Sequence, residues 1–265
     1  MKKLLNNRAF LWTALCFCAL LAGVLGFLTV RPALYLAATT PPPPSPTLTP
    51  SPTPIPSPTP TPTPTPSPSP TPTPYFPPEE LKSSQALNPH VIAWMEIPDT
   101  AIRYPVLLHP TEDNHYLNIT IEGGYGYPGS VYTNSMEGKD FETFNTVLYG
   151  HNMADGSYFG SLKNYNDADF CAAHREIDIY TPERKLVYKV CAVVTYDDRY
   201  ITDFYDDSRE ADRAAFLRSL RECGAVTLDN FPTDTQGHIL TLSTCIGGMP
   251  NNRLLIVAAE EQALS

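Results

Sequence analysis

The stretch that decides the fold runs Ile239-Leu-Thr-Leu-Ser-Thr-Cys245-Ile-Gly-Gly-Met-Pro-Asn-Asn-Arg253-Leu-Leu-Ile-Val257. An apolar run ends at Cys245, a turn rich in Gly, Pro and Asn follows, and a second apolar run opens at Arg253, which predicts strand, loop, strand. The two residues then fall at adjoining ends of neighbouring strands. A guanidinium beside a thiol favours the thiolate and receives an oxyanion. Taken alone, Cys245 favours the simpler interpretation of a buried cysteine next to a solvated arginine.

A second stretch, Asn145-Thr-Val-Leu-Tyr-Gly-His151-Asn-Met153, changes that balance. Another short β-rich run ends there at Gly-His, and a histidine held at a strand end supplies the acid and base that a cysteine nucleophile needs. His115 is a rival, but it falls in a polar turn or short helix, where a structural histidine is more common than a base. The same structural interpretation applies to the other histidines in loops or turns, which are His90, His109, His174 and His238.

Three features together resemble the sortases, the cysteine transpeptidases of Gram-positive surfaces. They are the Thr-Leu-Ser-Thr-Cys sequence that ends at Cys245, the arginine eight residues later, and Tyr-Gly-His-Asn-Met about ninety residues upstream. The resemblance extends over roughly residues 80 to 260 and is greatest to the class B subgroup. It implies a mainly β fold, a closed, mixed, eight-stranded barrel with peripheral helices, onto which the apolar runs can be placed.

The resemblance also implies a mechanism. Cys245 attacks the peptide carbonyl of a C-terminal sorting signal on a surface protein and forms a thioacyl enzyme. His151 protonates the leaving amine, and Arg253 holds the substrate backbone and stabilises the charged oxygen. Ser243 and Thr244 are expected to line the substrate groove or donate hydrogen bonds in a supporting role, with the alternative that they are simply strand residues. An amine of a cell-wall peptide or a pilin then resolves the intermediate; neither the pentapeptide motif nor the choice between these acceptors follows from the sequence.

The first 78 residues contain no Asp or Glu, whereas all 28 acidic residues follow them. Residues 1–8 are predicted to be a cytoplasmic N-terminus, 9–30 an uncharged transmembrane anchor, and 31–78 a disordered extracytoplasmic linker rich in Pro, Ser and Thr. A cleaved signal peptide is the competing interpretation of the apolar segment. Residues 79–265 then form the catalytic domain outside the cell membrane.

The catalytic domain carries 14 Lys and Arg against 28 Asp and Glu, a formal charge of −14. Such an acidic domain is a poor candidate for binding nucleic acid, which needs a basic surface. The spacing of its four cysteines matches no metal site and no other metal cluster is visible, so no cofactor and no metal are predicted. Binding of Ca²⁺ by the acidic loops is left open, although Asp-rich turns are usually just solvated. Cys245 is expected to be free, while a disulfide between Cys171 and Cys191 is left open.

Local patterns predict the other elements. One or two short helices are expected between residues 78 and 92, strands over 93–97 and 102–107, short helices over 158–165 and 167–173, and a hairpin of 176–180 with 185–195. A helix over 207–223 is expected to be capped by Asp207 or Ser208 and ended by Gly224. Its predicted apolar stripe consists of Ala211, Ala215, Phe216, Leu220 and Cys223. In class B sortases a helix at this place forms one wall of the substrate groove.

Three other functions are compatible with parts of the sequence. An L,D-transpeptidase-like enzyme would need Gly before and Arg directly after the cysteine, where this chain has Thr244 and Ile246. A papain-like hydrolase would place the cysteine at the start of a helix. A stalked adhesin without catalytic activity would account for the anchor and the linker, and would leave Cys245, His151 and Arg253 unexplained.

Overall fold

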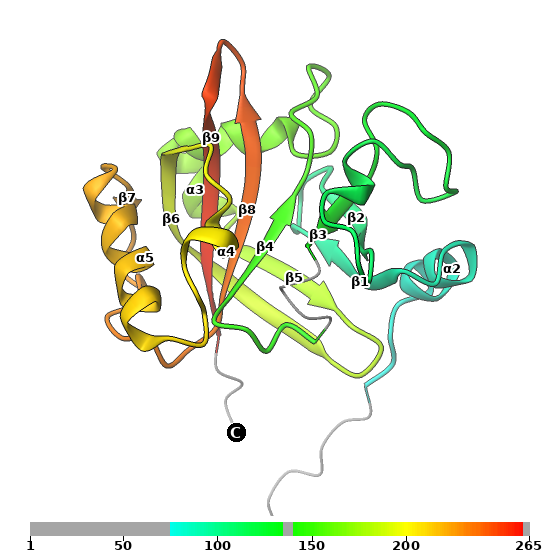
Figure 1. Ribbon diagram of the computed structural model, residues 1–265, viewed down its shortest axis with the longest axis horizontal. Coiled ribbons are helices and arrows are strands. Elements are labelled where there is room, and N and C mark those ends of the chain that lie inside the picture. The colour runs from blue at the N-terminus through cyan, green and yellow to red at the C-terminus, as the bar shows by residue number, and fades with distance from the viewer. Residues whose placement is uncertain (1–74, 135–139, 262–265) are drawn as a thin grey trace, which may run out of the picture. The chain divides into compact units, whose positions relative to one another are not determined.

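The computed structural model of the protein describes residues 75–134 and 140–261 (Figure 1). The predicted cytoplasmic segment, the apolar span and nearly all of the proline-rich linker lie outside these residues. Within the two described ranges, no helix is long and apolar enough to cross a membrane.

The described residues form a closed barrel of eight strands with a short ninth strand at its side. The strands are β1 (Val91–Glu96), β2 (Arg103–Leu108), β3 (Val131–Thr133), β4 (Asn145–Tyr149), β5 (Glu176–Tyr180), β6 (Lys185–Asp197), β7 (Val226–Thr227), β8 (Ile239–Ile246) and β9 (Met249–Glu260). They pair in the order β5-β1-β2-β3-β4-β8-β9-β6, and the pairing of β5 with β6 closes the ring. Strand β7 pairs with β6 outside this ring. The β2–β3 and β4–β8 pairs are parallel and the others antiparallel, so the predicted closed, mixed barrel is confirmed.

Strands β8 and β9 are covered on both faces, which explains why their sequences are almost continuously apolar. Leu240 and Leu242 of β8 belong to the cluster that fills the barrel. Ile239 of β8 and Leu255 and Val257 of β9 belong to a second cluster, outside the barrel, which also contains residues of the long helix after β6. Alternate side chains of each strand therefore pack into the barrel core or into the outer core. A shift of one residue in the strand pairing would move each set of side chains into the wrong core.

Helix α2 precedes the first strand, and the other helices lie in the connections between strands. They are α2 (Glu79–Leu87), η2 (His115–Leu117), η4 (Gly160–Asn166), α3 (Ala168–Ala173), α4 (Ile201–Phe204) and α5 (Glu210–Glu222), of which η2 and η4 are 3₁₀ helices. The predicted hairpin is confirmed, with its second strand extended to Asp197. In the region between residues 78 and 92 there is one helix, and β1 already begins at Val91.

The long helix α5 differs from its prediction at its start and on its apolar face. It follows Arg209, with no capping bond from a side chain. Neither proposed cap acts as one: Asp207 instead accepts a hydrogen bond from the backbone N–H of Asn145, at 2.8 Å, and so joins the helix entry to β4. The buried face consists of Phe216, Leu217 and Leu220, whereas Cys223 is exposed. Gly224, at φ 75°, ends the helix as predicted.

Candidate active site

Cys245 lies near the end of β8 as an exposed, free thiol. Its backbone partner on the neighbouring strand β9 is Arg253. The pairing becomes irregular immediately after Cys245, where the chain turns through Gly247 and Gly248. The Arg253 guanidinium is held by its own strand, since its Nη1 donates to the carbonyls of Pro250, at 3.1 Å, and Asn252, at 3.0 Å. The start of β9 therefore carries a permanent positive charge next to the strand that carries the thiol.

His151 follows the end of β4 by two residues. Its Nε2 lies 2.9 Å from the carbonyl oxygen of Leu117, the last residue of η2. Because a carbonyl oxygen only accepts, Nε2 must carry a proton in this arrangement. The ring of Tyr127 packs edge-on against the imidazole, with 4.6 Å between the ring centroids. Two segments that are remote from β4 in the sequence thus orient this histidine.

Three hydrogen bonds extend the parallel β4–β8 pairing up to the site. The Gly150 N–H donates to the Ser243 carbonyl at 3.2 Å, and the Thr244 hydroxyl donates to the Gly150 carbonyl at 2.7 Å. The Asn152 side chain then donates to the Cys245 carbonyl at 2.8 Å. The residues on both sides of His151 are therefore tied to the strand that carries Cys245.

The predicted groove residues Ser243 and Thr244 are both buried, with 5% and 3% exposure. The Thr244 hydroxyl is committed to Gly150, so its contact in this structure is with the protein backbone. Asn152 was not among the predicted site residues. Its place in the sequence, directly after His151, is the signal that could have identified it.

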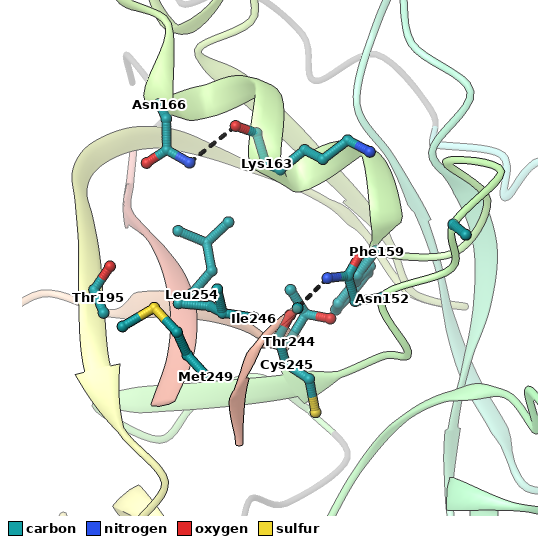
Figure 2. Close-up of a pocket in the computed structure, with 12 residues that line it drawn as sticks. Asn152, Phe159, Lys163, Asn166, Thr195, Thr244, Cys245, Ile246, Met249 and Leu254 are labelled. Atoms are coloured by element: carbon teal, nitrogen blue, oxygen red, sulfur yellow. Dashed lines mark hydrogen bonds between the residues drawn. The ribbon is translucent and has the colours of Figure 1, made fainter. Parts of the chain in front are cut away.

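Two cavities meet at Cys245. The first, which we call the histidine cavity, has a volume of about 230 Å³. All five predicted site residues line it, namely His151, Ser243, Thr244, Cys245 and Arg253. The second, the lysine cavity, has a volume of about 540 Å³ and is lined by Lys163, Asn166 and Met249 among others (Figure 2). Figure 2 shows the Cys245 sulfur directed away from Lys163 and Asn166.

Aromatic residues form one side of the histidine cavity. The Tyr132 and Tyr149 rings stack with centroids 5.4 Å apart, and Tyr200 approaches Tyr149 at 6.4 Å. Burial raises the pKa of the Tyr132 hydroxyl, which remains protonated and donates to Asn114 at 2.9 Å. Tyr132 and Tyr149 escaped the sequence analysis because tyrosines in short apolar strands look like ordinary core residues, and Tyr200 because it lies in the connection after β6.

The connection between β6 and β7 lines the histidine cavity with the residues that directly follow β6, and not with the long helix α5 as expected. Asp198, Arg199 and Tyr200, which precede α4, line the cavity. Helix α5 contributes no residue to either cavity at Cys245 and packs against the outer core. Helix α5 is therefore not a wall of either cavity, since its apolar face covers the barrel, and its expected role in the substrate groove stays a prediction.

The other described cysteines differ from Cys245 in their surroundings. Cys171 and Cys191 are buried free thiols, so the disulfide left open by the sequence is not formed. Burial raises the pKa of Cys191 to about 12, and the pKa of Cys171 is raised for the same reason. Thiols with such raised pKa values hold their protons at neutral pH and are poor nucleophiles.

Comparison with known proteins places the chain in a family. The sortase domain family model matches residues 95–262, and the chain belongs to the sortase family of cysteine transpeptidases. Among its relatives, sortase B of Listeria monocytogenes is 33% identical over 172 residues, which are 63% of this chain and 67% of that protein. The family assignment and the position of Cys245 in a strand disfavour the papain-like, L,D-transpeptidase-like and adhesin alternatives.

Solved structures give the same result. A crystal structure of sortase B from Bacillus anthracis superposes with a TM-score of 0.61 and 28% identity, covering 70% of this chain and 85% of that one. A Streptococcus pyogenes class B sortase involved in pilus biogenesis superposes with a TM-score of 0.59 and 26% identity, covering 69% and 98%. The resemblance to class B sortases is therefore confirmed in both sequence and fold.

Proposed function

We propose that this chain cleaves the C-terminal sorting signal of surface proteins and transfers the acyl fragment to an amine of the cell wall or of a pilin, with Cys245, His151 and Arg253 as the catalytic residues. The observation that carries the proposal is the histidine cavity, which all three residues line. Sortases act on surface proteins that carry sorting signals. Pilin is kept as an acceptor because the similar Streptococcus pyogenes enzyme is involved in pilus biogenesis.

The first half of the reaction forms a thioester. The Cys245 thiolate attacks the carbonyl carbon of the scissile peptide, and the carbonyl oxygen becomes an oxyanion beside the Arg253 guanidinium. Collapse of this intermediate breaks the carbon–nitrogen bond, and the imidazolium of His151 gives its proton to the leaving amine. An imidazolium carries a proton on each nitrogen, so the Nε2–H can stay on the Leu117 carbonyl while the other ring proton is transferred.

The second half releases the product. A new amine attacks the thioester carbon, its proton passes to the neutral His151, and the carbon–sulfur bond breaks to restore the thiolate. The hydrogen bonds from Thr244 to Gly150 and from Asn152 to Cys245 keep the histidine segment and the nucleophile strand in one geometry through both halves.

The decisive experiment is mass spectrometry of the protein incubated with a library of sorting-signal peptides, with and without an added amine. We expect a thioacyl adduct on Cys245 and, with the amine, a new amide product. Cys245→Ala should remove both and leave the fold unchanged, whereas Cys223→Ala, the matched change at the other exposed thiol of the described residues, should retain both. Turnover by a folded Cys245→Ala protein would falsify the assignment of the nucleophile.

The proposal includes a location. Residues 9–30 would anchor the chain in the cell membrane with residues 1–8 in the cytoplasm, and residues 31–78 would hold the catalytic domain, 79–265, on the extracytoplasmic side. Support comes from the uncharged apolar span and the basic residues that precede it. Cell fractionation should recover the full chain with membranes and a chain without residues 1–30 in the soluble fraction. Equal solubility of the two chains would contradict the anchor.

A further inference from the structure

A cluster of metal-ligating side chains lies outside the catalytic residues, in the segment from the end of β2 to the first residue of η2. His109, Glu112 and His115 each offer one ligand atom, and these atoms all lie within 4.8 Å of one another. The two imidazole rings stack, with centroids 4.1 Å apart. We propose that these three side chains form a binding site for a divalent transition-metal ion, and zinc is the ion with which we test it.

The chemistry of the ligand set supports this assignment. Two imidazoles and one carboxylate, with water in the fourth position, are a common tetrahedral set for zinc. Zinc bonds of about 2.0–2.2 Å would bring the ligand atoms to roughly 3.4 Å from one another. The side chains have room for that movement, because the His115 side chain is 29% exposed and that of Glu112 65% exposed. Binding therefore requires rotation of the exposed Glu112 side chain and of the partly buried His109 and His115 rings out of their stacked arrangement.

Two hydrogen bonds already orient these groups. His109 Nδ1 accepts from the backbone N–H of Glu112 at 3.0 Å, so its lone pair faces the loop. His115 Nδ1 lies 2.8 Å from Glu112 Oε2, and because the carboxylate only accepts, that nitrogen carries the proton. A metal ion bound to Nδ1 of both rings would replace these two contacts; His109 would keep its proton on Nε2, and the proton of His115 would move from Nδ1 to Nε2. Coordination thus exchanges partly exposed hydrogen bonds for metal bonds.

The proposed site is connected to the active site through η2. His115 is the first residue of this turn and Leu117 the last, and the Leu117 carbonyl accepts the hydrogen bond from His151. The backbone of Gly129 packs closely against the same carbonyl. Only glycine fits there, because a Cβ at this position would lie 2.3 Å from the Leu117 oxygen. A metal ion that restrains His115 therefore restrains the group that orients His151.

Calorimetric titration of the full chain with zinc tests the proposal. The chain should carry Cys245→Ser, because the nucleophilic thiol and His151 would otherwise compete for the ion. We expect one zinc ion whose affinity falls by at least about tenfold in His109→Gln/His115→Gln and in Glu112→Gln. His174→Gln, a change at a histidine at the end of α3, is the matched control and should bind as before. Equal affinity in all the variants, or no zinc binding, would overturn the site.

The connection to the active site has its own readout. When the same proteins are titrated with zinc and followed by NMR, the imidazole signals of His151 should shift as zinc binds. They should not shift in His109→Gln/His115→Gln. Zinc binding without any change at His151 would overturn the connection through η2. None of these measurements requires turnover, so failure of the metal site is distinguishable from failure of the proposed transpeptidation.

Discussion

Replacing Thr244 with valine removes one hydroxyl from the join between β4 and β8 and leaves the side-chain volume almost unchanged. The lost bond is the 2.7 Å contact with the Gly150 carbonyl, next to His151. Because Thr244 is only 3% exposed, water cannot replace the hydroxyl easily. We expect a loss of about 1–2 kcal/mol in the free energy of unfolding, the usual cost of leaving a partly buried carbonyl unpaired. In a domain of this size that lowers Tm by roughly 2 to 8 °C.

The kinetic effect separates a positioning role for Thr244 from a role in binding substrate. With the segment around His151 loosened, kcat should fall by roughly 10- to 100-fold while KM stays unchanged. Urea unfolding and steady-state peptide cleavage measure the two effects, and Thr244→Ser, which keeps the hydroxyl, should retain most of kcat. The reasoning is refuted if Thr244→Val raises KM at constant kcat, because the hydroxyl would then contact the substrate.

Two further predictions concern charged residues. Arg253→Lys should lower kcat/KM for peptide cleavage by about 100-fold without unfolding the protein, because an ammonium lacks the fixed donors of a guanidinium, and an unchanged kcat/KM would remove Arg253 from the mechanism. Burial raises the pKa of Asp207 despite the bond from Asn145, so its contribution to stability is lost as pH rises through that pKa. In urea unfolding, the stability of Asp207→Asn relative to wild type should therefore increase as the pH rises from about 3 to about 7. Asp206→Asn should change in the opposite direction, since Ser208 lowers the pKa of Asp206, and equal pH profiles would contradict both signs.

Much of the barrel was predictable because its signals are local. The apolar runs of β8 and β9, the turn between them and the hairpin of β5 with β6 all follow from side-chain patterns within about twenty residues. The family resemblance added the closed order of the strands. The start of α5 was not predictable, because Asp207 is a good cap by its type but is used by Asn145, a residue of β4 that is 62 positions away.

By itself, the sequence determined which reactive side chains the catalytic domain carries, namely a cysteine, a histidine and an arginine. It also determined that all three fall at the ends of apolar runs. Only the tertiary structure decided what surrounds them. The Leu117 carbonyl that holds His151, the Asn152 amide on the Cys245 carbonyl and the aromatic side of the histidine cavity all join segments that are far apart in the chain. The physical reason is that side-chain periodicity depends on neighbouring residues, whereas a hydrogen bond between distant segments forms only once the barrel has closed around its core.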